Sequence, residues 1–134
     1  MMDMLQAVLD ERVAPLVRGM NLRLVSAAPD AVVVALPVVP HVVHAAGYLC
    51  GQAIMAAMDT VMVLAVMAHA GERRPMATVQ LQTSFLRGVP QDAGEAILTG
   101  RILRATKSLA FGEVHLLLPD GKVAAHATTT CALL

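Results

Sequence analysis

The sequence predicts an α+β domain in which a strongly curved antiparallel sheet wraps around one long central helix. Two observations support this fold class. Residues 52–70 form an almost uninterrupted apolar run, which is typical of a helix that is covered on most of its sides. Residues 76–132 divide instead into four stretches of strand-like composition separated by turn residues. A sheet folded around the helix would supply the apolar cover that the helix needs.

The length of 134 residues predicts a single domain over residues 1–134. The chain is 57% hydrophobic and only 15% charged, whereas charged residues make up about a quarter of an average soluble chain. Such a small apolar chain has more apolar surface than its own interior can bury. Burial between subunits is the simplest solution, so we expect a homodimer or a homotetramer.

The N-terminal part of the chain predicts one helix and two strands. Residues 3–18, within an N-terminal helical segment over residues 1–18, have apolar side chains near helical spacing and predict a short amphipathic helix interrupted around Pro15. Residues 21–28 have an extended pattern that ends in a turn. The β-branched run at 31–36 then predicts a strand that pairs back on the previous one.

The middle and C-terminal parts predict a loop, the long helix and the remaining strands. Residues 37–51 contain two prolines, two histidines and two glycines, which predicts a loop of functional interest. The helix that follows ends near Gly71. The four strands are expected at 76–87, where Val79, Leu81 and Thr83 alternate with polar residues, and at 96–105, 109–118 and 123–132.

The charge balance and the N-terminal composition exclude several classes of protein. Ten basic residues balance ten acidic ones, so no basic surface is available and nucleic-acid binding is not expected. Early acidic residues, Asp3 and Asp10 among them, disfavour a signal peptide, and we expect a cytoplasmic protein. The 52–70 run approaches the length of a membrane span, but Asp59 near its middle would cost roughly 2.5–3.5 kcal/mol there. No membrane span is therefore expected.

Asp59 is the most informative single residue. Its neighbours three and four positions away on the helix are apolar, so none of them can pair with a carboxylate. A structural Asp bonded to backbone, or one facing a subunit interface, is one interpretation. The other is a carboxylate in an apolar cleft, whose pKa desolvation raises toward that of a useful general base or nucleophile.

Two glycines, Gly47 and Gly51, come directly before or at the start of the long helix. The N–H groups at a helix N-terminus are unpaired and lie at its positive dipole end. Because glycine permits close approach of a ligand to the backbone, a developing oxyanion could be stabilised here. Ordinary turn glycines are the alternative.

Residues 47–59, GYLCGQAIMAAMD, resemble the G-x-x-H-G-G-x6-D pattern of hotdog-fold thioesterases of the phenylacetate-degradation (PaaI-like) group. The resemblance continues through TVQLQTSFLR at 78–87, GRILRATKSLAF at 100–111 and the segment at 121–130. It covers about 100 residues, with the motifs in the order that the family requires. The resemblance implies a hotdog fold and an acyl-CoA thioesterase without a separate cofactor, since CoA is part of the substrate.

The resemblance also implies roles for individual residues. Asp59 matches the catalytic acid, which either activates water or attacks the thioester, and Gly51 matches the glycine whose N–H polarises the carbonyl. Thr78 matches a position that helps to place the nucleophilic water. His44 stands where the family often has Asn. The family's split site fits the helix geometry, because eight residues separate Gly51 from Asp59 by ~12 Å.

Three positions around the site differ from the family pattern: Cys50 replaces His, Gln52 replaces the second Gly, and His44 replaces Asn. Cys50 and Gln52 are expected to contact substrate, and Met55 and Met62 belong to a methionine-rich pocket wall with Met58 and Met67. The residues expected to meet the phosphates of CoA at a subunit interface are Arg87, Arg104 and Lys107.

Other chemistries have less support in the sequence. Cys50 as a nucleophile has no base at a defined spacing. His41 and His44 lack further ligands for a metal, so no metal site is expected. His69, His115 and His126 occur singly and are expected to be structural or surface residues.

Two rival functions remain beside acyl-CoA hydrolysis. A hotdog hydratase or dehydratase would pair a loop histidine, His41 or His44, with the helix carboxylate. A non-catalytic acyl-CoA binding protein would explain the departures at Cys50 and Gln52. The sequence leaves the acyl group open between aryl and medium-chain.

Overall fold

The computed structural model describes residues 1–134 and contains every helix and strand that the sequence predicts. The elements are α1 (Met2–Glu11), α2 (Pro15–Arg18), β1 (Arg23–Ala28), β2 (Ala31–Pro37), α3 (Gly51–Ala70), β3 (Met76–Phe85), β4 (Glu95–Ala105), β5 (Leu109–Leu117) and β6 (Val123–Leu133). The predicted N-terminal helix is divided in two, because Pro15 begins α2 at its first position, where its missing N–H costs nothing.

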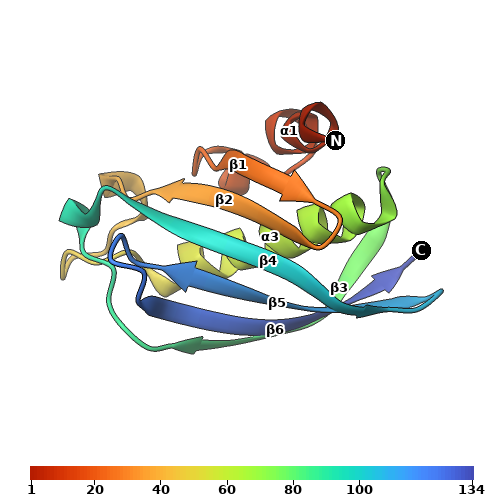
Figure 1. Ribbon diagram of the computed structural model, residues 1–134. Coiled ribbons are helices and arrows are strands. Elements are labelled where there is room, and N and C mark those ends of the chain that lie inside the picture. Colours follow the sequence, from red (N-terminus) through yellow and green to blue (C-terminus); the bar gives the residue numbers. More distant parts are fainter.

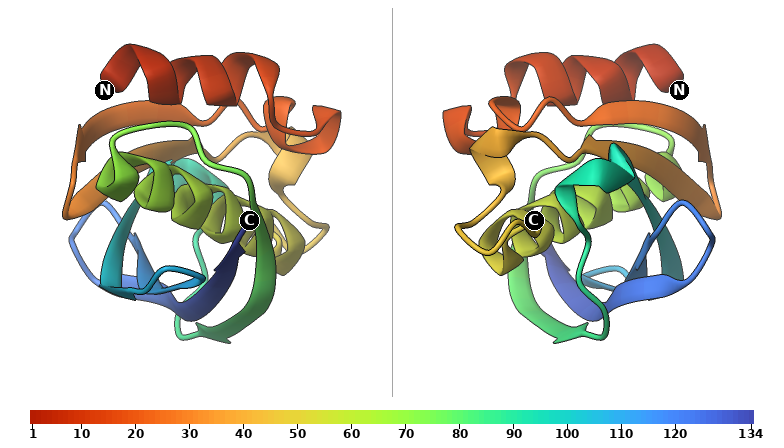
Figure 2. Two further views of the ribbon diagram at one scale, coloured as in Figure 1. Left: turned by 90° about the vertical axis from the view of Figure 1, so that its right-hand side faces the viewer. Right: turned by 90° about the vertical axis from the view of Figure 1, so that its left-hand side faces the viewer.

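The six strands form one antiparallel sheet in the order β1-β2-β4-β5-β6-β3. Helix α3 lies along the concave side of this sheet, and α1 lies over β1 (Figure 1). The end views show the sheet curving around α3 (Figure 2). This confirms the predicted α+β hotdog architecture, in which β1 and β3 are the two edge strands.

The sheet covers only part of α3. Residues such as Met58, Val61 and Met62 are fully buried against the strands. Met55, near the start of the helix, is 37% exposed, and Asp59 and Val63 are half-buried. The sheet therefore leaves one face of the helix uncovered, and that face carries Asp59.

The edge strand β3 departs from the simple alternation that the sequence predicts. Thr78 pairs with Cys131 and Gln80 with Thr130, so Val79 is an extra residue in a β-bulge. Val79 is 63% exposed and does not share the inner face with Leu81 and Thr83. Because the bulge reverses the alternation, Thr78 can point toward α3 although it is an even-numbered residue on a strand whose odd-numbered residues face the helix.

Helix α3 is long and apolar enough to cross a membrane, with a mean hydropathy of 1.8. However, 61% of that apolar window is buried inside the fold. The core helix of a sheet-wrapped domain meets the same criterion of length and composition.

Candidate active site

Asp59 and Thr78 form the centre of the candidate site. The hydroxyl of Thr78 donates a hydrogen bond of 2.6 Å to Oδ1 of Asp59. This partner lies 19 residues along the chain, so the helix neighbours of Asp59 could not reveal it. One carboxylate oxygen is thus held by the sheet edge, while the carboxylate lies on the open face of α3.

A cysteine thiol extends this pair into the sheet. Cys131 is fully buried and stands opposite Thr78 in the β3–β6 register. Burial raises the pKa of the Cys131 thiol, a hydrogen bond with Thr78 opposes that rise, and the charge of Asp59 adds to it. No local pattern in the sequence connects Cys131 with the site, because only the strand pairing brings it to Thr78.

The N-terminus of α3 presents free donors. Its first residue, Gly51, follows Cys50, whose side chain makes no capping hydrogen bond. The backbone N–H groups of Gly51, Gln52 and Ala53 have no acceptor in the structure, whereas that of Ile54 bonds the Cys50 carbonyl. These groups at the positive end of a 20-residue helix can donate hydrogen bonds to an anionic oxygen.

A cavity of about 540 Å³ opens beside these donors. It brings His44, Gly51 and Arg87 together with the aromatic rings of Tyr48 and Phe85. A Cβ on Gly51 would stand 3.4 Å from Cζ of Phe85, so the Phe85 ring lies directly against the backbone at the helix start. A side chain at this position would therefore contact the Phe85 ring at the start of the helix.

Two features of this cavity were not predicted from the sequence. The Tyr48 ring lies over Gly88, where an added Cβ would come within 2.8 Å of Cδ1 of Tyr48. The guanidinium of Arg87 donates to the carbonyl of Val123 at 2.7 Å, which holds the side chain along the cavity wall. The short Phe-Leu-Arg-Gly run at 85–88 is the only local feature that marks this cavity wall. The contact of Gly88 with Tyr48 joins residues 40 positions apart, so no local pattern could show it.

The cavity and the Asp59–Thr78 pair are separate within one chain. Gly51 and Asp59 lie eight residues apart on the same helix, which corresponds to ~12 Å along its axis. One thioester carbonyl cannot meet both of them in a single subunit. Within one chain, the free N–H donors at Gly51 and the Asp59–Thr78 pair are thus exposed at two separate places on α3.

The predicted substrate contacts near the helix start are divided between its sides. Cys50 and Gln52 line a different, small cavity of about 150 Å³ with His41. They do not face the cavity that contains Gly51. Met55 lies on the same open helix face as Asp59 and is 37% exposed.

The predicted methionine wall is also divided by the helix. Met62 is fully buried and packs against Gly112 of β5, and Met58 is fully buried as well. Neither side chain is open to solvent in this structure. Met55 is exposed, and Met67 is half-buried against the core.

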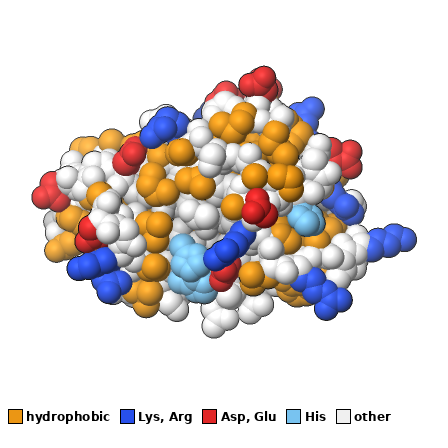
Figure 3. Space-filling view, in the orientation of Figure 1, with side chains coloured by type: hydrophobic (Ala, Val, Ile, Leu, Met, Phe, Trp, Pro, Cys, Tyr) orange, Lys and Arg blue, Asp and Glu red, His pale blue; other side chains and the backbone are white.

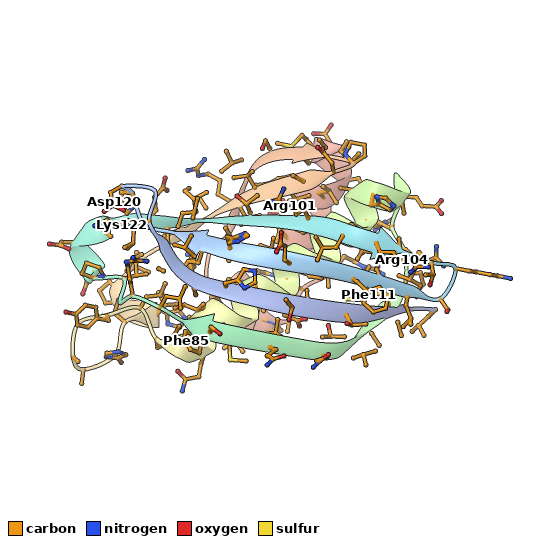
Figure 4. The ribbon with its side chains drawn as sticks, turned by 60° about the horizontal axis from the view of Figure 1, so that its bottom comes forward. Phe85, Arg101, Arg104, Phe111, Asp120 and Lys122 are labelled. Carbon is orange, nitrogen blue, oxygen red and sulfur yellow. The ribbon has the colours of Figure 1, made fainter.

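The three basic residues assigned to CoA phosphates do not converge within one chain. Arg87 follows Phe85 at one end of the sheet, whereas Arg104 lies at the opposite end (Figure 4). Lys107 is in the turn between β4 and β5, next to Arg104, and its carbonyl accepts a hydrogen bond of 3.3 Å from Arg74.

A polar cluster on the outer face of the sheet corrects one prediction. His115 and His126 are cross-strand partners with ring centroids 4.6 Å apart, so they are not single residues. Their side chains form a compact patch on the surface that faces the viewer in Figure 3. Glu113 bonds both His126 and Arg101 at 3.2 Å. The hydrogen bond with His126 holds the pKa of Glu113 below its usual range. This group lies on the side of the sheet opposite α3 and takes no part in the candidate site.

Solved structures with the same arrangement identify the fold class. The chain resembles a conserved protein of Pseudomonas aeruginosa at 27% identity, with 91% of this chain and 95% of that chain covered and a TM-score of 0.83. Thioesterase superfamily member 2 of zebrafish covers 99% of this chain, with 95% of its own chain matched, at 20% identity and a TM-score of 0.84. A Streptococcus mutans protein, solved with bound acetyl-CoA, matches at 20% identity and a TM-score of 0.78 over 85% of this chain and 89% of its own. The protein is therefore a hotdog-fold protein.

The family follows from the sequence model of the thioesterase superfamily, which matches residues 46–125, more than half of the chain. The chain belongs to the thioesterase superfamily. The matched residues include both halves of the candidate site, from Gly51 through Thr78. No curated protein matches the chain with significance.

Proposed function

We propose that this protein hydrolyses acyl-CoA thioesters, with Asp59 as the general base. The observation that carries the proposal is the Asp59–Thr78 pair on an open apolar helix face, in a chain that also exposes free N–H donors at Gly51. A buried or half-buried carboxylate without a basic partner is costly unless it has a function. Membership of the thioesterase superfamily supports the same reaction class.

The proposed reaction uses one water molecule and no cofactor. Thr78 donates to Oδ1 of Asp59, which leaves Oδ2 free to accept a proton from that water. The resulting hydroxide attacks the carbonyl carbon, and the Gly51 N–H stabilises the negative oxygen of the tetrahedral intermediate. When the carbon–sulfur bond breaks, the proton on Asp59 passes to the leaving thiolate. The products are a carboxylic acid and free CoA.

The site requires two subunits. Because Gly51 and Asp59 are ~12 Å apart along one helix, we propose that each active site combines Gly51 of one chain with Asp59 of another. The uncovered face of α3 and the exposed residues of the edge strand β3 support an interface there, since Val79 and Phe85 are 63% and 52% exposed. A homodimer satisfies both requirements, and a homotetramer would be a pair of such dimers.

The cavity beside Gly51 is the proposed entrance for CoA. His44 and Arg87 supply polar and cationic groups there, and Tyr48 and Phe85 supply apolar walls. The Streptococcus mutans structure, solved with acetyl-CoA, supports a CoA thioester as the ligand. We propose that His44 makes a polar contact with the substrate near the thioester.

The test is thiol release from a panel of acyl-CoA esters, comparing the wild-type protein with Asp59→Asn. The Asn side chain can still accept from Thr78, so the fold and the melting temperature should be retained. Loss of a general base lowers the rate by about 10²–10⁴-fold. If Asp59→Asn hydrolyses the best ester at the wild-type rate, the proposal is wrong, and a non-catalytic acyl-CoA binding protein becomes the better assignment.

A hydratase or dehydratase would need a histidine beside the helix carboxylate. Within one chain, neither His41 nor His44 makes a hydrogen bond or ion pair with Asp59, whose hydrogen-bond partner is Thr78. Analysis of products separates the two reactions, since hydrolysis releases a free thiol and hydration changes the acyl chain with the thioester intact.

A further inference from the structure

A second cavity, of about 460 Å³, lies at the C-terminal end of α3. Four apolar residues, Val8, Val63, Met67 and Met76, line it together with Pro75 and three arginines, Arg12, Arg73 and Arg74. Its walls come from α1, α3 and the chain that leads from α3 into β3. None of the residues assigned to the reaction lines this cavity.

The cavity nevertheless adjoins the catalytic pair. Val63 and Met67 are one and two helical turns beyond Asp59, on the same half-buried face of α3. On the facing strand, Met76 precedes Thr78 by two residues. A bound chain that extends from Asp59 along the helix toward its C-terminus therefore contacts Val63 and Met67 and then reaches the arginines.

The arginines have no acidic partner. Arg12 and Arg73 form no ion pair within 4.0 Å, and Arg74 makes one hydrogen bond, to the carbonyl of Lys107. Three like charges around one cavity repel one another, and this repulsion is relieved when an anion enters. The guanidinium group is also the side chain best suited to bind a carboxylate through two parallel hydrogen bonds.

We propose that this cavity binds the far end of the acyl group and that this end carries a carboxylate, so that the preferred substrates are medium-chain dicarboxylic acyl-CoA esters. The proposal rests on the proposed thioesterase function for the position of the thioester. An apolar wall that leads to a cationic end matches a methylene chain that ends in an anion. If the arginines bound a phosphate of CoA instead, the apolar wall that lies between them and Asp59 would have no role.

The length of the cavity sets the chain length. From Asp59 to Met67 the helix rises ~12 Å, and an extended chain gains about 1.2 Å per bond. About ten bonds span that distance. An eight-carbon diacyl group covers about eight of them, from the thioester carbon to a carboxylate oxygen, and a hydrogen bond of about 2.9 Å from that oxygen to an arginine covers the remainder. Suberoyl-CoA, with a carboxylate at the end of an eight-carbon chain, and octanoyl-CoA, its neutral counterpart, are therefore the matched probes.

The experiment measures calorimetric binding of both esters to the Asp59→Asn protein, which should not consume them, and kcat/KM for both on proteins that retain Asp59. Suberoyl-CoA should bind more tightly than octanoyl-CoA. Arg73→Gln and Arg12→Gln should each weaken suberoyl-CoA binding by about 10- to 100-fold, as expected for a lost charge-assisted hydrogen bond, and should leave octanoyl-CoA within about twofold. Arg23→Gln, at an exposed ion pair with Glu95 on β4, is the control for net charge.

The alternatives give different results. Equal losses for both CoA esters, absent for octanoyl-pantetheine, would mean that the arginines bind the phosphates of CoA, and the acyl-end proposal would be overturned. No effect of either substitution on suberoyl-CoA would overturn it as well. Selective suberoyl-CoA binding without thiol release by the wild-type protein would instead retain this site and reject the thioesterase function.

Discussion

The Thr78 hydroxyl lies 2.6 Å from Oδ1 of Asp59 and joins the central helix to the edge strand at the point where the strand bulges. In a regular strand without the bulge at Val79, Thr78 would share the alternation of Gln80 and Gln82 and point away from α3. The bulge is thus a positioning device: it turns a hydroxyl toward the carboxylate and leaves the rest of β3 in register with β6.

Thr78→Val should lower kcat and change stability little. Valine keeps the shape of threonine and removes the donor, so Asp59 loses the hydrogen bond that orients it. A hydrogen bond to a charged group contributes about 1.5–3 kcal/mol, which corresponds to a rate loss of roughly 10- to 100-fold. Steady-state thiol release and thermal melts on one preparation check this.

Two further variants make that result specific. Thr78→Ser keeps the hydroxyl and should restore most of the rate. Thr83→Val, on the same strand, removes only a weak 3.9 Å contact with the sulfur of Met58 and should leave the rate unchanged. A Thr78→Val protein with normal turnover would show that the hydrogen bond is structural.

Gly51→Val should block access to the free N–H at the helix start. The first added carbon would already stand 3.4 Å from the Phe85 ring, and the branched methyl groups would fill the remaining passage. Loss of an oxyanion donor lowers kcat by about 10²–10³-fold. Phe85→Ala in the same protein makes room for the valine. If the rate recovers in this double variant, the loss in Gly51→Val comes from contact between the valine and the Phe85 ring and not from loss of the N–H donor.

The sequence predicted the elements of the fold well because each has a strong local signal. The apolar run of α3, the glycine at position 71 and the turn residues between the later strands each indicate a boundary through local chemistry alone. The structure places Gly71 in the left-handed conformation that ends α3, with φ of +75°. Local patterns could not show that one face of α3 stays open, because coverage depends on where the sheet edges end.

The site was predictable only in part, for the same reason. Asp59 was conspicuous as a lone carboxylate in an apolar helix. Its contact with Thr78 spans 19 residues and depends on a bulge, and Cys131 arrives through strand pairing alone. The four methionines look alike in the sequence but differ in burial: Met58 and Met62 are fully buried, whereas Met55 is exposed and Met67 is half-buried.

The two cysteines should differ in reactivity. Cys131 is fully buried, and burial raises the pKa of its thiol, so it stays protonated and inaccessible at neutral pH. Cys50 is half-buried beside a small cavity. Iodoacetamide should therefore label Cys50 in the folded protein and both cysteines in urea, as measured by mass spectrometry. Rapid labelling of Cys131 without denaturant would contradict the packing around the Asp59–Thr78 pair.

Stability should depend on Glu113 at acid pH. The hydrogen bond with His126 holds the pKa of Glu113 below the ordinary value of about 4.3. A carboxyl group whose pKa is lowered by folding stabilises the folded state above its unfolded pKa, and this contribution disappears as the pH falls through the folded pKa. The melting temperature of the wild type should thus exceed that of Glu113→Gln near neutral pH, and the difference should shrink below about pH 4. A difference that stays constant from pH 3 to 7 would show that Glu113 acts through packing.

The split site makes a quantitative prediction for mixed subunits. Gly51→Val and Asp59→Asn should each be inactive alone, because every site in either protein lacks one partner. In a mixed dimer, one site receives Gly51 from the Asp59→Asn chain and Asp59 from the Gly51→Val chain, so that site is intact. Random exchange of equal amounts makes half of the dimers mixed, each with one active site of two, and should restore about a quarter of the wild-type rate.

Co-expression with two affinity tags, followed by light scattering and thiol-release assays, measures both the assembly and the recovery. No recovery in dimers that demonstrably contain both chains would place Gly51 and Asp59 in the same subunit's site and reject the two-subunit mechanism, as would a fully active monomer of 14.1 kDa.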